Sequence, residues 1–310
     1  MTDIPENAPT TDLDRVLGFT IPGRSARGRV ARLGPALAAV LDAHAYPPAI
    51  EALLAEALTL AALIGSTLKD KEGQLTMQTR TENGVVQLLV CDYRGGEVRG
   101  YVQYDADKLA EAPEQPTLFA LFGQGYLAIT FDLATSGERY QGIVPLDGET
   151  LADAAESYFV QSEQIPSMVR VGMARDPAGR LVAGGLFLQH LPEGEDGRER
   201  LHTRLDHPEW EHVAALGATT AAAELADPAL PLETLVWRLF NEEDDVRVFA
   251  STLLTRGCRC TAAHIGSVLG KFPIEERRAM ADDAGIIHVD CAFCSIKFPV
   301  PAETIEPATL

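Results

Sequence analysis

Two close pairs of cysteines near the C-terminal end constrain the fold of this chain more than any other feature. Cys258 and Cys260 form a C-x-C pair, and Cys291 and Cys294 form a C-x-x-C pair further along the chain. Four thiolates can surround a tetrahedral zinc ion at Zn–S distances of about 2.3 Å, with no open coordination position. A closed site of this kind stabilises structure and performs no hydrolysis. The spacing therefore predicts one structural Zn2+ ion held by these four residues.

The same four thiols are also compatible with the disulfide framework of a secreted protein. The first residues, however, contain acids and prolines where a signal peptide has a basic segment and an apolar run. No stretch approaches about 18 uninterrupted apolar residues, so we expect no segment that spans a membrane. We therefore expect a cytoplasmic protein, where thiols are kept reduced, and favour zinc over permanent disulfides.

Composition narrows the possible functions. A chain of 310 residues with 46% hydrophobic residues can bury a large core, and its length suggests about two domains. The formal net charge of −19 works against binding the phosphate backbone of nucleic acids, which requires clustered Lys and Arg. The charge suits a soluble protein that must stay dispersed while it exposes apolar surface.

Hydrophobic periodicity predicts an α+β core. Apolar residues at helical spacing predict helices over 34–41, 49–68 and 151–161, and a period of two predicts strands over 75–79, 85–90, 98–104, 126–131 and 140–144. Two more strands are expected on either side of Asp176–Gly179. We therefore expect an antiparallel sheet covered by helices.

A helical linker is expected after the core. The run Pro192–Gly197 is the clearest linker signal. An amphipathic stretch follows, with one apolar stripe at helical spacing that consists of Leu232, Leu235, Val236, Leu239 and Phe240. In the resting protein we expect this stripe to dock on the core, and the alternative is that it becomes exposed on demand to bind other proteins.

The C-terminal segment is expected to contain a helix capped by Thr261, a second helix that begins at Pro273, and a hairpin around the second cysteine pair. A segment of this size with so few apolar residues is not expected to fold stably without a metal ion. The predicted organisation is a disordered tail (1–14), an α+β core domain (15–194), a helical linker (195–250) and a small zinc-binding domain (251–310).

Three segments resemble one known family. The cysteine pairs, Tyr158–Pro166 and Leu121–Thr130 are similar in order and sequence to the bacterial redox-regulated heat-shock chaperones, the thirty-three-kilodalton holdases. The similarity extends over about residues 14 to 299, nearly the whole chain. The resemblance implies an ATP-independent chaperone that is inactive when reduced and zinc-bound, and that prevents aggregation of unfolding client proteins when oxidised.

The resemblance also implies how such a switch is built. Oxidation would form the Cys258–Cys260 and Cys291–Cys294 disulfides, release zinc and unfold the zinc domain and linker. The linker would then take part in client binding, and oxidised molecules would associate as homodimers. His264 and His288 lie near the cysteine pairs, so an imidazole could replace one thiolate at the metal. Cys91, in an apolar strand, is expected to be a buried lone thiol.

Two other functions are compatible with parts of the sequence. A zinc ribbon that binds nucleic acid is the first, but the arginines and lysines around the cysteines are offset by acids, and no basic stripe results. A thiol oxidoreductase is the second, but its C-x-x-C belongs at the start of a helix in a βαβ unit. The chain has no G-x-S-x-G, P-loop or H-E-x-x-H motif, so we do not expect an enzyme.

Overall fold

The computed structural model describes residues 12–191 and 207–305 and divides the chain into two compact units. The first unit comprises Met1–Leu41 and Tyr46–Arg256, and the second comprises Asp42–Ala45 and Gly257–Leu310. Where it is described, the segment predicted to be the linker belongs to the first unit. The run Pro192–Gly197 and the first eleven residues of the predicted tail lie outside the described residues.

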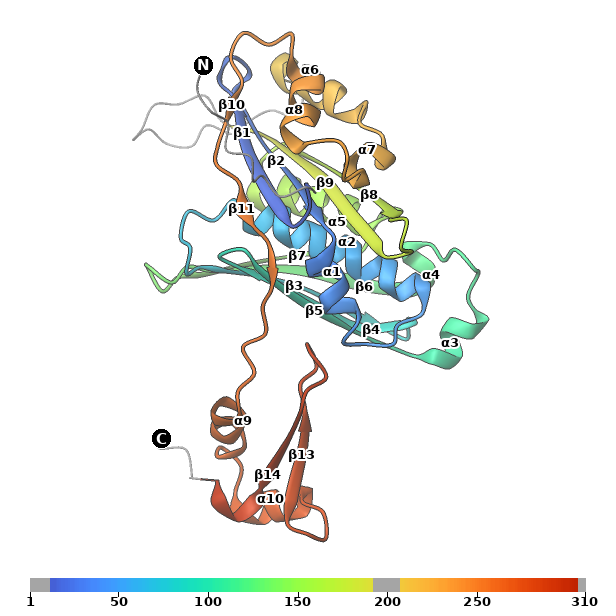
Figure 1. The fold of residues 1–310 in the computed structure, drawn as a ribbon, viewed down its shortest axis with the longest axis vertical. Helices are drawn as coiled ribbons and strands as arrows, with labels where there is room; N and C mark the ends of the chain where they lie inside the picture. Colours follow the sequence, from blue (N-terminus) through green and yellow to red (C-terminus); the bar gives the residue numbers. More distant parts are fainter. Residues whose placement is uncertain (1–11, 192–206, 306–310) are drawn as a thin grey trace. The chain divides into compact units, whose positions relative to one another are not determined.

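Two six-stranded sheets form the framework of the first unit (Figure 1). The first sheet has the order β10-β1-β2-β9-β8, with β11 also paired to β1, and the second has the order β12-β5-β4-β3-β6-β7. The strands of the first sheet are β1 (Arg15–Ile21), β2 (Ala26–Leu33), β8 (Ser167–Arg175), β9 (Leu181–His190), β10 (Arg247–Val248) and β11 (Thr252–Leu253). Those of the second are β3 (Gln74–Glu82), β4 (Val86–Arg94), β5 (Glu97–Tyr104), β6 (Gln124–Asp132), β7 (Arg139–Pro145) and β12 (Thr255–Arg256).

The helices of the first unit form two groups. Between or beside the sheets lie α1 (Pro35–Leu41), α2 (Pro48–Gly65), α3 (Ala106–Glu111), α4 (Leu118–Phe122), α5 (Leu151–Tyr158) and the short turns η1 (Pro22–Arg24) and η2 (Phe159–Glu163). The second group, from the predicted linker, consists of α6 (Pro208–Ala218), α7 (Ala222–Ala226) and α8 (Leu232–Phe240). The predicted α+β class is confirmed, with antiparallel pairing throughout both sheets except between β12 and β5.

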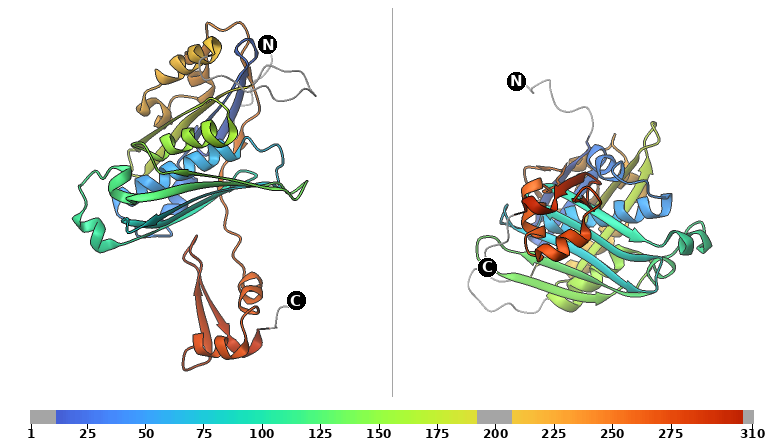
Figure 2. Two further views of the ribbon diagram at one scale, coloured as in Figure 1. Left: turned by 180° about the vertical axis from the view of Figure 1, so that it is seen from behind. Right: turned by 90° about the horizontal axis from the view of Figure 1, so that it is seen from below.

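Helix α2 is the centre of the main hydrophobic core. It lies between the two sheets, as Figure 1 and the left view of Figure 2 show, and it contacts strands of each. Its length and apolar composition would suffice to cross a membrane, but 72% of it is buried inside the fold. A helix that is apolar on nearly all sides and buried in this way is a core helix.

The sequence did not predict the hairpin of β1 and β2, nor that the strands divide into two sheets. Alternation in β2 is obscured because Arg27, Arg29 and Arg32 interrupt its apolar residues. The predicted tail is also corrected at its end, where Asp14 accepts hydrogen bonds from the backbone N–H groups of Gly34 and Ala36. Such partners, distant in sequence, anchor a segment whose composition is typical of disorder.

The linker helices cover one face of the first sheet. Leu235, Val236 and Phe240 of α8 are each 1% exposed, and the Phe240 ring lies 5.6 Å from that of Phe19 on β1. The sheet contributes Leu17, Phe19, Ile21, Ala26, Val30, Met168, Leu186 and Leu188 to this cluster, and the helices contribute Trp210, Val213, Leu225, Leu230, Leu232, Leu235, Val236 and Phe240. Leu239 packs against it while partly buried. The expected docking of the apolar stripe on the core is therefore confirmed.

Glycines on the sheet allow α7 to approach closely. A Cβ atom at Gly172 on β8 would meet the Ala222 carbonyl oxygen at 2.0 Å, and one at Gly184 on β9 would meet that of Leu225 at 2.0 Å. Real atoms cannot approach so closely, so the backbone of α7 lies directly on the sheet only because these positions lack side chains.

We expect Gly184→Ala to displace α7 from the sheet and to destabilise the docked linker by about 3 kcal/mol, the upper part of the usual cost of overpacking. Faster hydrogen exchange in α7 and α8, with unchanged exchange in α2, would measure this displacement. Gly23→Ala is the matched control, because nothing lies within 4 Å of a Cβ at that position. Equal exchange in both variants would contradict the prediction.

The edges of both sheets are completed by one short segment, Arg247–Arg256. Its strands β10 and β11 pair with β1, and β12 pairs in parallel with β5. Leu254, between β11 and β12, is 1% exposed and joins the main core, while the side chains of all three strands are exposed. The segment is thus held by backbone hydrogen bonds and one apolar anchor.

The second unit has a small core of its own. It contains α9 (Ala262–Leu269), α10 (Ile274–Met280), β13 (Ile286–Asp290), β14 (Lys297–Pro301) and η3 (Ala302–Thr304). Its buried apolar cluster consists of Leu269, Ile287, Ala302 and Ile305. Thr261 caps α9 as predicted, by accepting a hydrogen bond from the His264 N–H, whereas Pro273 stands at the N-cap of α10 instead of its first position. A core of four residues is too small to stabilise the unit alone.

Candidate metal centre

The four cysteines of the C-terminal unit converge on one point. All four Sγ atoms lie within 4.8 Å of one another. The Sγ of Cys258 is 3.2 Å from that of Cys260 and 3.6 Å from that of Cys291, and the Sγ of Cys260 is 3.3 Å from that of Cys294. The structure therefore brings both cysteine pairs into one cluster.

Local backbone geometry positions each pair. Cys291 and Cys294 lie in the turn between β13 and β14, where the Cys291 carbonyl accepts hydrogen bonds from the N–H groups of Cys294 and Ser295. Ser295 adopts a left-handed conformation with φ 57° and closes this turn. Cys258 and Cys260 lie in the loop after β12, immediately before the Thr261 cap. The C-x-x-C thus occupies a β-turn and not the start of a helix, unlike the motif of a thiol oxidoreductase.

The separations suit a tetrahedral metal ion. Four sulfur atoms at about 2.3 Å from a zinc ion are about 3.8 Å from one another, close to the observed distances. A disulfide would require a sulfur–sulfur distance of about 2.05 Å, and all four cysteines are free thiols. Four soft thiolate donors in this arrangement are the ligand set of a structural zinc site. The donor chemistry and the geometry therefore both fit zinc, with Cys258, Cys260, Cys291 and Cys294 as ligands.

Crowding of the thiols also shifts their acidity. Burial acts to raise the pKa of Cys258, but hydrogen bonds from the Cys260 backbone and from the neighbouring thiols outweigh it and lower that pKa to about 7. Burial and the hydrogen bonds among the thiols raise the pKa of Cys260, and burial is the main cause that raises the pKa of Cys291. Without a cation, the pKa of Cys258 therefore lies below those of Cys260 and Cys291. A bound zinc ion would keep all four thiols deprotonated.

The nearby histidines do not join the cluster. The His288 Nε2 atom lies 2.9 Å from an Asp282 carboxylate oxygen, and both side chains are exposed. His264 is exposed on α9, and among the described residues the one group with metal-binding geometry contains only cysteines. Among the described residues, the geometry therefore favours four thiolate ligands over an imidazole ligand. Cys91 is fully buried, as predicted, and burial raises its pKa well above the usual range.

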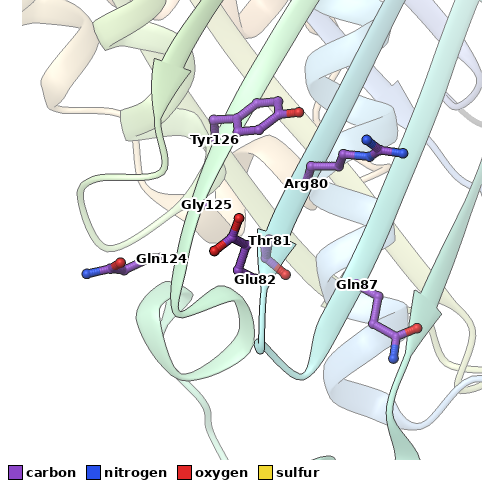
Figure 3. A pocket seen from close by; sticks show the side chains of 7 residues that line it. All are labelled: Arg80, Thr81, Glu82, Gln87, Gln124, Gly125 and Tyr126. Atoms are coloured by element: carbon purple, nitrogen blue, oxygen red, sulfur yellow. The ribbon is translucent and has the colours of Figure 1, made fainter.

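A hollow on the second sheet lacks the features of a site. Its lining side chains come from β3, β4 and β6 and spread apart instead of converging on one point (Figure 3). Arg80, Glu82 and Gln124 in this hollow are exposed. These residues are ordinary polar positions on the outer face of a sheet.

The sequence reasoning missed the residue that holds the linker most directly, Arg32. Its side chain on β2 is fully buried, and it donates hydrogen bonds to the backbone carbonyls of Leu225 and Leu230 at 2.8 Å and of Glu224 at 3.1 Å. These carbonyls belong to α7 and to the connection from α7 to α8. Burial lowers the pKa of Arg32, while Asp12 and Asp227 act against that shift. No sequence pattern reveals this contact, because its acceptors are backbone groups far along the chain.

Comparisons with known proteins agree with this architecture. The model of one protein family, described as Hsp33 protein, matches residues 14–300. A 33 kDa chaperonin of Caulobacter vibrioides is 41% identical over 302 residues, which cover 95% of this chain and 97% of that protein. A 33 kDa chaperonin of Pseudomonas fluorescens is 36% identical over 297 residues, 95% of this chain and 93% of that protein. The crystal structure of a 33 kDa chaperonin from Thermotoga maritima shares the fold, with a TM-score of 0.75, 23% identity and coverage of 94% and 96% of the two chains.

Proposed function

Because the chain belongs to the Hsp33 family, we propose that it is a redox-regulated, ATP-independent holdase chaperone of the cytoplasm and not an enzyme. The reduced, zinc-bound form is inactive. Oxidation converts it into a form that binds unfolding proteins and prevents their aggregation. The observation that carries this proposal is the cluster of four free thiols in a unit whose described part has a core of four buried apolar residues.

The proposed switch is a change in bonding at the cysteines. Cys258 pairs with Cys260 and Cys291 with Cys294. Each pair of thiolates transfers two electrons to an oxidant such as hydrogen peroxide, which takes up two protons from solvent and leaves as two water molecules. Disulfide sulfurs no longer act as thiolate ligands, so zinc is released. When bound, zinc contributes on the order of 10–16 kcal/mol to the folding of a small domain.

The new disulfides cannot replace that contribution. A disulfide that closes a loop of 15 residues stabilises by about 3 kcal/mol, and loops as short as these contribute less. The C-terminal unit therefore unfolds. Its unfolding frees the linker segment, exposing the stripe of Leu232, Leu235, Val236, Leu239 and Phe240 and the sheet face beneath it. This apolar surface holds client chains, oxidised molecules associate as homodimers, and the net negative charge keeps the complexes in solution.

The test combines metal content, free thiols and activity. Before oxidation we expect one zinc ion and the five thiols of the sequence, and after peroxide treatment at a mildly unfolding temperature we expect no zinc and one thiol, Cys91. Helical signal should fall and suppression of client light scattering should appear with the same time course. Suppression that appears while zinc remains bound would contradict the proposed switch.

A further inference from the structure

The linker and the sheet face beneath it carry opposite charges. Residues 207–256 contain nine acidic and three basic residues, and the chain as a whole has a net charge of −19. Three arginines nevertheless contact the linker from beneath it: Arg15 on β1, Arg32 on β2, and Arg24 in the turn that follows β1. These arginines place positive charge directly against the acidic linker.

Arg24 marks one end of the face. It follows β1 in the turn η1, and its Nε lies 2.7 Å from a carboxylate oxygen of Glu243. It also pairs with Glu209 at the start of α6. The Glu243 side chain is only 7% exposed and has His212 as a second partner at 2.8 Å. One arginine therefore binds two carboxylates of the linker.

Arg15 and Arg32 mark the other end. They are neighbours in the register of β1 and β2, and Arg15 forms an ion pair with Glu233 in the first turn of α8. Asp12 pairs with Arg15 at 2.6 Å and lies 3.5 Å from Arg32, so it offsets one of the two charges. Between the two ends, Leu17 and Phe19 of β1 are apolar and buried beneath α8.

The docked segment thus shows which chemical features this face can bind. Glu233 pairs at one end, Glu243 pairs at the other, and the apolar stripe of α8 packs between them. A strand of the length of β1 spans about 20 Å at 3.3 Å per residue, which separates the two positive ends.

Resting on the proposed function, we propose that this face, once uncovered, selects client segments in which an apolar stretch is flanked by carboxylates on both sides. Apolar packing supplies most of the affinity, and the arginine pairs supply the selection. The net negative charge of the whole protein attracts basic clients at long range. A preference for acidic flanks would therefore have to come from local pairing with the arginines. Local pairing and general electrostatics are therefore distinguishable by experiment.

The experiment uses the oxidised full-length chain and two synthetic peptides. One has the sequence of residues 231–245, and its twin has lysine in place of every acidic residue. At low salt we expect the acidic peptide to bind about ten-fold more tightly, with the difference shrinking above about 0.1 M salt, where exposed charges are screened. The double variant Arg15→Glu/Arg24→Glu should reverse this order.

Arg80→Glu is the matched control, because it makes the same type of charge change on the exposed hollow of the second sheet (Figure 3). It should leave the affinity ratio unchanged. If the double variant fails to fold, the single variants Arg15→Gln and Arg24→Gln should each bring the ratio closer to one. Equal affinities, or tighter binding of the lysine peptide, would overturn the selection alone. An oxidised chain that binds neither peptide and suppresses no aggregation would overturn the proposed function itself.

Discussion

Replacing Cys291 with serine is expected to unfold the C-terminal unit in the reduced protein while the first unit stays folded. A serine hydroxyl is a poor zinc ligand, and the remaining three thiolates form an incomplete site. Loss of even part of a contribution on the order of 10–16 kcal/mol exceeds what the core of Leu269, Ile287, Ala302 and Ile305 can supply. Zinc content should fall to near zero, and the amides of α9, β13 and β14 should lose their protection from hydrogen exchange.

Two measurements separate this outcome from general damage. Cys91→Ala removes a buried thiol from the first unit and should retain zinc and an ordered C-terminal unit. Under the proposed function, Cys291→Ser should also suppress client aggregation without an oxidant. A reduced Cys291→Ser protein with normal zinc content and full protection in β13 and β14 would show that this cysteine is not a ligand.

Replacing Arg32 with methionine should release the linker while the zinc site remains intact. The change leaves the carbonyls of Leu225, Leu230 and Glu224 buried without their donor. Each unsatisfied buried group costs about 1–3 kcal/mol, so we expect a loss of at least about 3 kcal/mol in the docking of α7 and α8. Hydrogen exchange in α7 and α8 of the reduced, zinc-bound protein measures this loss.

The conservative and control variants sharpen the result. Arg32→Lys keeps the charge but cannot direct a planar fork of donors at three carbonyls, so an intermediate effect is expected. Arg80→Met, on the exposed outer face of the second sheet, should have no effect on the linker. If Arg32→Met leaves exchange in α7 and α8 unchanged, the buried hydrogen bonds do not hold the linker.

The sequence predicted those parts of the molecule whose signals are local. The spacing of four cysteines predicted a site that the structure assembles within 4.8 Å, and the period of α8 predicted the face that it buries. A period of two in the apolar residues predicted β3, β4, β5, β6 and β7 of the second sheet. These patterns depend on residues close in the chain, which a single sequence displays directly.

Features that depend on distant partners were not predictable. β2 contains three arginines, and only the structure shows that the Arg32 guanidinium donates hydrogen bonds to backbone carbonyls of α7 and of the loop that follows it. Asp12 and Asp14 belong to a segment whose composition predicts disorder. In the structure, their carboxylate oxygens accept hydrogen bonds from backbone N–H groups near the starts of α1 and α8. The pairing of β12 with β5 could likewise not be predicted from the sequence, because a strand of two residues is too short to show a period of two.

The way Arg247–Arg256 completes the sheets has a consequence for the proposed unfolding of the C-terminal unit. Its three pairings hold only two residues each, and the last ends at Arg256, directly ahead of the Cys258 loop. If the cysteine loop unfolds as proposed, we expect the loss of pairing to follow the chain from β12 to β11 with the Leu254 anchor and then to β10, before it reaches α8. Under the proposed function, we therefore expect activation by this route to be graded, with mild stress uncovering only the sheet edges and severe stress also releasing the helices.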